Sequence, residues 1–556
     1  MPVIKKTKRA VGGFSTGRTM TNLRPHQVLK MPPCTDACPS SNDMRYCLTT
    51  VAQTEKAERT YDESFQLAFA TLTKTNPLPM VCGQVCPHLC QQQCNRKDKD
   101  EAVNISAVEW AVGDYGLKNN IAHKKITEEI RTEKVAVIGS GPSGLSCAYQ
   151  LARRGYPVTI FESYDKAGGM LRWGIPDYRL RKDLLDKEIQ AILNLGVEIK
   201  YNTRIGENIT LDDLHKDYKA VYAAIGGHIG MKLGVPGEDG VNVFTGADFL
   251  RRVNSGEKVN VGKKVIVIGG GNSAIDAAQV SKRLGAEVTL HYRRTVKEMP
   301  AIEHEVKAAE EEGVKYDFLS APVAVLKSGD RATGMKFIRM ELGEPDASGR
   351  PRPVPMAGSE YEVQADTIIA SVSQQPDFKG LEQLKNEKGW ISVDDKSMTS
   401  LPGVFAGGDV TNQLGLVTEA IGLGRKAAES IDAHLRGTQP ETVEKPPIIH
   451  SDKMRLDFYN SVPQNKAPSL SVSERVDNFK PVVSLMEQAQ VIDESKRCMS
   501  CGTCFGCDDL CFSYCQVGAV KRNPVGSQYK YHFELSMCDG CKKCAEECPC
   551  GFIDML

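Results

Sequence analysis

The stretch KVAVIGSGPSGLSCAYQLARRGYPVTIFE, Lys134–Glu162, decides the fold of the central part of the chain. An apolar run leads into Gly139-x-Gly141-x-x-Gly144, a helix-prone segment follows, and a second β-prone run ends at Glu162. Glycines at this spacing let a strand-to-helix turn close on a pyrophosphate, and an acid about twenty residues later binds a ribose hydroxyl. The glycines alone are weak, but together with strand, helix and acid they predict a dinucleotide-binding βαβ unit.

A second copy of the pattern, KKVIVIGGGNSAIDAAQVSKRLGAEVTLHYRR, spans Lys263–Arg294. Its second strand ends without an acid, and arginines stand in that place. An arginine there accommodates the 2′-phosphate of NADP, which an acid would repel. The alternative is that the arginines are merely solvated, so NADP is favoured over NAD without excluding it. We expect this second site to be lined by Gly269, Gly271, Asn272, Ser273, Ala274, Arg293 and Arg294.

Length and composition limit the class of protein. The chain has 556 residues, 41% of them hydrophobic, and its 70 Lys and Arg balance its 70 Asp and Glu. This length predicts several domains, and the neutral charge does not indicate nucleic acid or an acidic membrane as partner. No apolar run approaches a bilayer span, and the basic N-terminus lacks the apolar segment of a signal peptide. A cytoplasmic location is therefore expected.

The 19 cysteines form two dense clusters, with seven between residues 34 and 94 and eleven between residues 498 and 550. A disulfide framework suits small secreted domains, and zinc sites usually separate two Cys-x-x-Cys pairs by a dozen or more residues. Runs of closely spaced cysteines instead favour iron–sulfur clusters. Cys147 stands alone and is expected to be a small core residue.

The last cluster contains the bacterial ferredoxin motif. Cys538-x2-Cys541-x2-Cys544-x3-Cys548 is followed by proline, a pattern in which the fourth cysteine ligates the other cluster. The upstream partner motif has one extra residue and no proline, and Cys498 and Cys501 offer a competing registration. We expect Cys498 and Cys550 to be ordinary thiols, and a β-hairpin over residues 519–537. The predicted ligands are Cys504, Cys507, Cys511 and Cys548 for one cluster, and Cys515, Cys538, Cys541 and Cys544 for the second.

Three further segments, GGMLRWGIPDYRL (Gly168–Leu180), YRRTVKEMPA (Tyr292–Ala301) and GVFAGGDV (Gly403–Val410), identify a family resemblance. Residues 30–435 resemble the pyridine nucleotide–disulfide oxidoreductase superfamily, in the branch of the glutamate synthase small subunit. Arg181 departs from that branch, which usually has proline there. The resemblance implies FAD in the first unit and NAD(P)H in the second. It implies an FAD site formed by Gly139, Gly141, Ser143, Gly144, Glu162, Gly169, Leu171, Arg172, Gly408, Asp409, Thr418, Ala420 and Ile421.

The first cysteine cluster resembles the helical iron–sulfur domain that precedes the flavin core in the same branch. Its expected ligands are Cys34, Cys38, Cys82, Cys86, Cys90 and Cys94. The Cys-x-x-Cys pair that usually precedes the counterpart of Cys34 is missing. The thiolates available for two complete clusters are therefore two too few, or one too few if Cys47 also acts as a ligand. One [4Fe–4S] cluster is predicted and a second is left open.

These observations predict a multidomain protein. A basic arm (1–30), either disordered or wrapped on a partner, precedes an α-helical iron–sulfur domain (31–131). The α/β core (132–436) has two Rossmann-like lobes for FAD and NAD(P)H, the second inserted at about 245–370. A linker (437–490), either a flexible tether or a strap over the core, leads to an α+β ferredoxin-like domain (491–556).

The order of carriers predicts an NAD(P)H:acceptor oxidoreductase that exchanges electrons with a redox protein in either direction. Between the clusters and the nicotinamide, FAD converts electron pairs into single electrons. The expected partner is a redox protein, namely a sulfite reductase, a 2-oxoacid oxidoreductase or a ferredoxin. The sulfite reductase is included because the chain resembles the NAD(P)H-oxidising partner of dissimilatory sulfite reductase. A glutamate synthase electron-input subunit and a self-contained flavoenzyme like dihydropyrimidine dehydrogenase are the alternatives, although no segment is long enough for the latter's barrel. The sequence leaves open whether the chain forms a homodimer or a hetero-complex.

Overall fold

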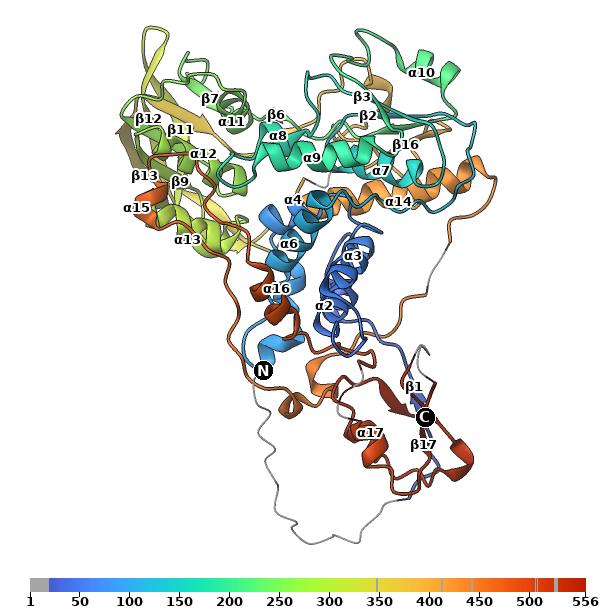
Figure 1. Ribbon diagram of the computed structural model, residues 1–556. Helices are drawn as coiled ribbons and strands as arrows, with labels where there is room; N and C mark the ends of the chain where they lie inside the picture. Colours follow the sequence, from blue (N-terminus) through green and yellow to red (C-terminus); the bar gives the residue numbers. More distant parts are fainter. Residues whose placement is uncertain are drawn as a thin grey trace.

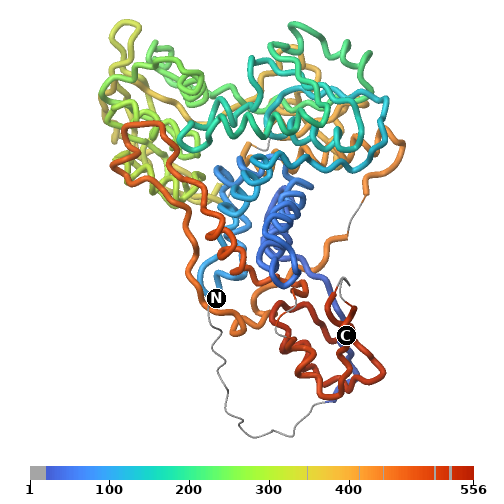
Figure 2. Tube along the Cα trace, in the orientation of Figure 1, coloured from blue at the N-terminus to red at the C-terminus, as the bar shows by residue number. Residues whose placement is uncertain are grey.

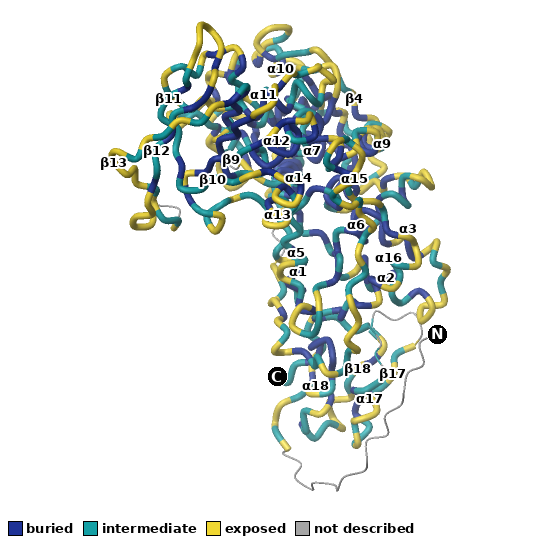
Figure 3. The backbone as a smooth tube through the Cα atoms, turned by 90° about the vertical axis from the view of Figure 1, so that its left-hand side faces the viewer, coloured by how far each residue is buried: buried dark blue, intermediate teal, exposed yellow. Residues whose placement is uncertain are grey.

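The computed structural model describes residues 20–346, 349–411, 414–441, 444–505, 507, 509–524 and 529–556. Two α/β lobes lie side by side at one end of the molecule, a helical domain lies beneath them, and a small domain with both described chain ends forms the opposite end (Figure 1). Buried backbone is concentrated in the lobes and the adjoining helices (Figure 3). Among the described residues, no helix combines the length and apolar character needed to cross a membrane.

The helical domain packs directly on the first lobe. Helix α3 begins at a capping box, in which Thr60 Oγ1 accepts a hydrogen bond from Glu63 N and the Glu63 carboxylate accepts one from Thr60 N. Residues of α4 share one apolar core with the first sheet of the lobes. The elements are α1 (Pro33–Asp36), α2 (Met44–Ala52), α3 (Tyr61–Leu72), α4 (Pro79–Val85), α5 (Leu89–Gln92), η1 (Asn95–Asp98) and α6 (Ile105–Lys118).

The first lobe is built on a five-stranded parallel sheet in the order β16-β5-β2-β3-β4. Its central strand β2 is wholly buried, as its unbroken apolar run requires. Helix α14 approaches α7 so closely that a Cβ on Gly424 would lie 2.2 Å from Ser143 O. The strands are β2 (Val135–Ile138), β3 (Val158–Phe161), β4 (Glu198–Lys200), β5 (Ala220–Ala223) and β16 (Val404–Ala406). The helices are α7 (Pro142–Ala152), α8 (Met170–Trp173), α9 (Lys182–Leu193), α10 (Leu211–Asp217), η3 (Glu382–Leu384), η4 (Asp409–Thr411) and α14 (Val417–Leu435).

The second lobe repeats this design with a five-stranded parallel sheet in the order β10-β9-β8-β14-β7, beside a three-stranded antiparallel sheet, β11-β12-β13. The short pair β6 (Ile229–Gly230) and β15 (Gln374–Gln375) joins the lobes. The strands are β7 (Val243–Thr245), β8 (Lys264–Ile268), β9 (Glu287–Tyr292), β10 (Lys315–Phe318), β11 (Ser320–Ser328), β12 (Arg331–Pro345), β13 (Pro351–Gln364) and β14 (Thr367–Ala370). The helices are α11 (Gly246–Asn254), α12 (Asn272–Arg283), η2 (Val296–Glu298) and α13 (Glu303–Glu311).

The described part of the predicted linker is a strap that contacts the second lobe and the helical domain (Figure 2). Val482 N donates to Tyr178 O at 3.0 Å, and Arg475 forms an ion pair with the buried Glu312. Of the two alternatives from the sequence, this is the strap and not the flexible tether. Its elements are η5 (Ser451–Lys453), η6 (Leu456–Phe458), α15 (Val472–Arg475) and α16 (Gln488–Ser495).

The small domain at the end is closed by both ends of the chain. Strand β1 (Pro25–Gln27) pairs antiparallel with β19 (Ile553–Met555). Residues 25–27 of the predicted basic arm are therefore neither disordered nor free to wrap a partner, while residues 1–19 lie outside the described part. The predicted hairpin is present as β17 (Val520–Arg522) and β18 (Tyr531–Phe533), with residues 525–528 undescribed. The remaining elements are α17 (Leu510–Ser513), η7 (Leu535–Met537) and α18 (Lys543–Glu546).

Candidate functional site

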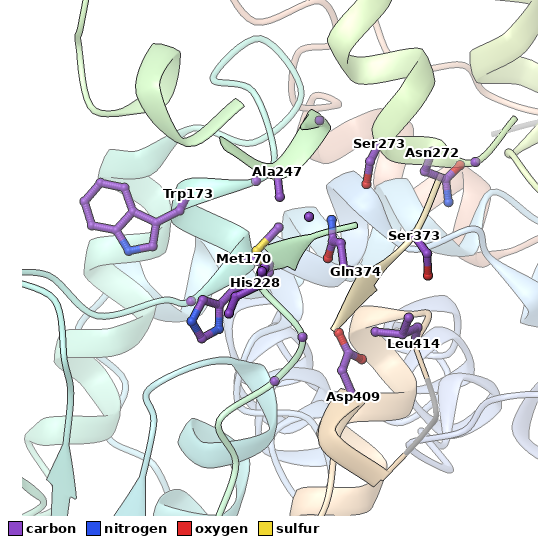
Figure 4. A pocket seen from close by; sticks show the side chains of 18 of the residues that line it. Met170, Trp173, His228, Ala247, Asn272, Ser273, Ser373, Gln374, Asp409 and Leu414 are labelled. Atoms are coloured by element: carbon purple, nitrogen blue, oxygen red, sulfur yellow. The ribbon is translucent and has the colours of Figure 1, made fainter. Parts of the chain in front are cut away.

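A cavity of about 1110 Å³ lies between the two lobes and is lined by both glycine-rich turns. Figure 4 shows side chains of both lobes around it, among them Asn272 and Ser273 of the second glycine-rich turn and Asp409 at the start of η4. In parallel α/β sheets, ligands bind outside the carboxyl ends of the strands, which is where this cavity lies. The cavity is the candidate site for both dinucleotides.

Two helices begin at this cavity without a side-chain cap. The N-cap of α7 is Gly141 and that of α12 is Gly271, and neither helix has a side-chain hydrogen bond to its first turn. A Cβ on either glycine would meet no atom within 4 Å. Backbone N–H groups at such helix starts, with open space in front of them, suit the pyrophosphate of a dinucleotide. The residues present therefore fit FAD and NAD(P)H.

The first turn depends on its glycines for different reasons. Gly139 has φ +97°, a conformation that side chains rarely adopt, and a Cβ on Gly144 would lie 2.0 Å from Gly139 O. Glu162 at the end of β3 is buried beside this turn and accepts hydrogen bonds from Ser140 N and Tyr164 N, both at 2.9 Å. Burial raises the pKa of Asp409 to about 6.

Most of the predicted dinucleotide residues line the cavity. In the first lobe they are Gly139, Gly141, Ser143, Glu162, Gly169, Leu171, Gly408, Asp409 and Ala420, and in the second Gly269, Gly271, Asn272, Ser273, Arg293 and Arg294. Five predicted residues do not line it: Gly144, Arg172, Ala274, Thr418 and Ile421. Gly144 and Ala274 serve helix packing, and Ile421 belongs to the core of the first lobe.

The side chains of Arg172 and Arg294 are both engaged by other residues of this chain. Arg172 is buried and donates to Ala167 O and to the Asp186 carboxylate. Arg294 is buried, donates to Pro351 O and forms an ion pair with Asp346 at 2.5 Å. Arg293 is exposed at the cavity. Of the two predicted arginines, Arg293 is thus the one whose side chain remains exposed to a ligand.

The sequence reasoning missed several residues of the cavity wall, including Met170, Trp173, His228 and Gln374 (Figure 4). Met170 and Trp173 stand inside the quoted segment Gly168–Leu180, so their motif had pointed to them. His228 lies between β5 and β6, and burial lowers its pKa. In the described part of the chain, the Trp173 indole N–H is buried without a partner. An unpaired buried donor in the wall of a cavity is consistent with a bound ligand.

The helical domain forms part of the same cavity wall. Val85 and Pro87, on either side of Cys86, line the cavity. Thr418, in the first turn of α14, turns to the helical domain, where its hydroxyl lies 3.8 Å from Cys38 Sγ and 3.0 Å from Ser40 Oγ. A Cβ on Gly422, one turn later, would lie 2.4 Å from Pro39 O. The cysteine-bearing loops therefore reach the flavin side of the cavity.

None of the nineteen cysteines, all of which lie in the described part of the chain, forms a disulfide. Sixteen of them fall into four groups, to which Cys47, Cys147 and Cys550 are not assigned. The first group is Cys38, Cys82, Cys86 and Cys90, which we term the proximal group. Burial raises the pKa of Cys82 well above its usual value, and its neighbours Cys86 and Cys38 raise it further; Cys38 and Cys86 act in the same way on Cys90. These thiols suit a [4Fe–4S] cluster, which replaces their protons with iron.

Cys34 and Cys94 do not share their surroundings with Cys82. Burial raises the pKa of Cys34 well above its usual value, and the nearby Cys94, Cys501 and Cys498 thiols raise it further. Cys94 and Cys498 pack against the same core that contains Cys34. We term Cys34, Cys94, Cys498 and Cys501 the medial group. The prediction that Cys498 is an ordinary thiol and not a ligand stays a prediction, and the structure packs Cys498 against the core that contains Cys34.

The tail cysteines form the other two groups, and their assignment as cluster ligands stays a prediction. Cys504, Cys507, Cys511 and Cys548 line one small cavity, together with Cys550. Burial and the neighbouring Cys538, Cys541 and Cys515 thiols raise the pKa of Cys544 to about 12. No three His, Cys, Asp or Glu side chains of the described chain converge closely enough to hold a single metal ion. A four-iron cluster occupies the space between its four thiolates and keeps them further apart.

Comparison with known families and proteins agrees with this geometry. Residues 133–424 match the family described as pyridine nucleotide-disulphide oxidoreductase, and residues 19–121 match the dihydropyrimidine dehydrogenase domain II with its 4Fe-4S cluster. The predicted class of the chain, an oxidoreductase with FAD, a pyridine nucleotide and iron–sulfur clusters, is thereby confirmed.

Three curated relatives illustrate how the family is used. The NADPH-Fe(3+) oxidoreductase subunit beta of Geobacter sulfurreducens is 37% identical over 84% of this chain and 75% of its own length. The NADP(+)-dependent formate dehydrogenase subunit beta of Moorella thermoacetica is 39% identical over 84% of this chain and 70% of its own. The glutamate synthase [NADPH] small chain of Escherichia coli K12 is 37% identical over 64% of this chain and 81% of its own. The chain is thus related to subunits of larger oxidoreductases, and it belongs to the pyridine nucleotide-disulphide oxidoreductase family.

Proposed function

We propose that this chain passes electrons between NADPH, bound in the cavity, and a partner redox protein that docks at the small domain formed by both chain ends. FAD, when bound, exchanges a hydride with the nicotinamide and single electrons with [4Fe–4S] clusters. The chain's own residues hold these groups in order from the cavity to the tail.

The observation that carries the proposal is the contact between the cavity and the proximal thiol group. Cys38 Sγ lies 3.8 Å from the hydroxyl of Thr418, which directly follows the cavity residue Val417, and Cys86 is flanked by the wall residues Val85 and Pro87. A site for a two-electron donor and a site for a one-electron carrier therefore share one wall. Such sharing is unnecessary in an enzyme that reduces a small molecule at its own flavin, but an electron relay requires it.

The preference for NADPH over NADH rests on charge. Arg293 is exposed at the cavity, and no acid ends β9, where an NAD-specific site would carry one. The three relatives above are named for NADPH or NADP(+), in agreement with this preference. Arg293 would pair with the 2′-phosphate, while Arg294 holds the loop at Asp346 in place.

The cavity residues bind and orient; none needs to act as a nucleophile or general acid. The uncapped starts of α7 and α12 bind the two pyrophosphates, and Glu162 is placed for a ribose. The Cys38 and Cys86 loops, with apolar Val85 and Pro87, close the wall on the helical-domain side and keep water from it.

A redox protein is the proposed partner because the relatives are subunits of larger enzymes and because the tail groups lie at the end of the molecule opposite the cavity (Figure 1). A sulfite reductase, a 2-oxoacid oxidoreductase and a ferredoxin remain the predicted partner classes. A cytoplasmic location also remains a prediction.

The test separates the cavity from the tail. In anaerobically purified protein, Cys541→Ala should remove one tail cluster, leave NADPH-dependent reduction of a small dye intact, and abolish reduction of a ferredoxin. Cys147→Ala, at a buried cysteine outside the four thiol groups, is the matched control and should leave both activities unchanged. Equal ferredoxin reduction by Cys541→Ala and wild type would contradict an exit through the tail. If the wild-type protein with FAD bound did not oxidise NADPH, the proposed function itself would be refuted.

A further inference from the structure

The medial thiol group contains two cysteines of the helical domain and two from beyond the strap. Cys34 and Cys94 were predicted as cluster ligands, but a complete set of four requires two further thiolates. The Cys498-x-x-Cys501 pair, which could supply them, lies some 400 positions later in the sequence. We propose that Cys34, Cys94, Cys498 and Cys501 together bind one iron–sulfur cluster, half of whose ligands the C-terminal part of the chain supplies. The inference goes beyond the proposed function, because it concerns which residues hold a metal centre.

The segment before Cys498 is anchored to the helical domain by a buried ionic network. Glu494 is wholly buried and accepts hydrogen bonds from Asn104 N at 2.7 Å, Asn465 N at 2.8 Å and Arg497 Nη1 at 2.6 Å. Buried charges persist only where they are paired and fully hydrogen-bonded, so this contact is specific to one placement of the segment.

Arg497, which directly precedes Cys498, uses all of its N–H groups in the same interface. Its Nε donates to Val462 O, Nη1 to Ala102 O and Glu494, and Nη2 to Glu101 O and Asp100, at distances of 2.6–3.1 Å. Its own backbone oxygen accepts from Arg96 Nη1 at 3.0 Å. Because Arg96 lies two residues after Cys94, this bond holds the chain next to Cys94 against the chain next to Cys498.

The segment after Cys501 is also anchored by hydrogen bonds. Arg45 Nη1 donates to Cys501 O and to Lys30 O, both at 2.7 Å. Lys30 N donates to Gly502 O at 3.1 Å, and Gly502 has φ +71°. A Cβ on Gly502 would lie 2.6 Å from Lys30 Cβ, so only glycine allows this approach. The Cys498–Cys501 turn is therefore fixed on both sides, and Cys498 and Cys94 pack against the same core as Cys34.

Asn95 provides a further link between the two halves of the group. Its side-chain amide donates to Ile449 O at 3.0 Å and to Met454 Sδ at 3.3 Å, and Cys501 packs on the same small core as these residues. Asn95 adjoins Cys94, so one side chain ties Cys94 to the surroundings of Cys501.

The chemistry of the group favours a cluster over four inert thiols. Three arginines stand at the group. Arg45 donates to Cys501 O, and Arg96 donates to the backbone oxygen of Arg497, the residue that directly precedes Cys498. Each thiol gives up its proton on ligating iron, and the three arginines then balance the negative charge of a thiolate-ligated cluster.

The position of the group supplies a step that the relay otherwise lacks. Tyr459 donates to Met499 O at 2.9 Å and packs on the same small core as Cys501. Its ring lies 6.3 Å from that of Phe505, which lines the cavity of the first tail group. The medial group thus adjoins the first tail group across Tyr459, and it shares the helical domain with the proximal group.

The test is metal content, which does not depend on catalysis. Anaerobically purified full-length protein should contain about 16 irons per chain, and Cys498→Ala/Cys501→Ala about 12, with FAD content unchanged. Cys147→Ala is the matched control, because Cys147 is wholly buried in the core of the first lobe and lies outside the group, and it should retain all its iron. Wild-type iron content in the double variant would overturn the proposal, as would zinc lost in place of iron.

A conservative pair of variants keeps the test sharp if the double variant does not fold. Cys34→Ser and Cys498→Ser should each change the electron paramagnetic resonance signal of one and the same reduced cluster, although the two residues stand at opposite ends of the sequence. Changes in two different signals, or in none, would refute a shared cluster. Because FAD reduction by NADPH is read separately by absorbance, failure of this proposal is distinguishable from failure of the proposed function.

Discussion

Replacing Arg497 by methionine tests how the C-terminal segment is fastened to the helical domain. Methionine keeps much of the apolar stem but removes the five hydrogen bonds of the guanidinium, leaving the carboxylate of Glu494 buried without its counter-ion. Breaking a buried pair by removing one partner costs about 3–5 kcal/mol. Glu494 is wholly buried and Arg497 is 2% exposed, so solvent screening does not reduce this figure.

Because about 1.4 kcal/mol corresponds to a factor of ten, the local opening of residues 488–505 should become between about 100-fold and several thousand-fold more frequent. Hydrogen exchange of the anaerobic holoprotein, followed by mass spectrometry of peptides from this region, measures the change. Peptides of β8 and α12 in the second lobe should exchange as in the wild type, since they lie outside the interface.

Two further variants decide whether the buried charge is the cause. Glu494→Gln/Arg497→Met should lose less protection than Arg497→Met alone, because no uncompensated charge remains. Arg181→Met breaks an exposed ion pair with Asp183 and should change protection by less than about 1 kcal/mol. If the double variant exchanged faster than the single one, or if Arg497→Met left residues 488–505 protected, the reasoning from the buried pair would be wrong.

The remaining predictions concern the nucleotide, pH and the chain ends. Arg293→Gln should raise KM for NADPH about tenfold, from the loss of a charge-assisted hydrogen bond, without changing KM for NADH; Arg294→Gln, which breaks the pair with Asp346, should leave the ratio of the two unchanged. Burial and Arg153 lower the pKa of His123 to about 4, below its value in the unfolded chain, so its contribution to stability is present above pH 6.5 and is lost as pH falls towards 4. Urea titrations at pH 5 and 7.5 should show a smaller difference in His123→Phe than in the wild type, and an equal difference would exclude His123 as the source. Deleting residues 1–30 should make the tail iron labile to a chelator, and so should Gly540→Ala, whose Cβ would lie 2.2 Å from Thr21 O; iron retained in both would show that β1 is dispensable.

Features that depend on local sequence were predictable. Each glycine-rich turn stands between a strand and a helix, as its spacing requires, and the second sheet begins with β7 at Val243 and ends with β14 at Ala370, close to the expected insertion at 245–370. The hairpin of β17 and β18 followed from β-prone runs around polar turn residues. For the turns and the hairpin, contacts between near neighbours in the sequence determine the structure, so a short window contains the information.

Features that depend on distant segments were not predictable. Nothing in the spacing around Cys498 indicates that Arg497 is buried against Ala102, or that Cys34 is the neighbour of Cys498. The arginines after β9 could not be ranked either, since only the fold reveals that Asp346 engages Arg294 and leaves Arg293 exposed. In each case the partner comes from another element, and a single sequence does not identify which.

The pairing of β1 with β19 has a consequence for how the protein matures. A ribosome releases residues 25–27 long before residues 553–555 exist, so the small domain cannot close until the latter have been synthesised. Translation order and assembly order therefore differ, and the unpaired early strand offers a docking edge to other nascent chains meanwhile. An affinity tag fused directly to Leu556, which hydrogen-bonds to Arg24, would sit beside this closing pair, and a spacer should separate the two.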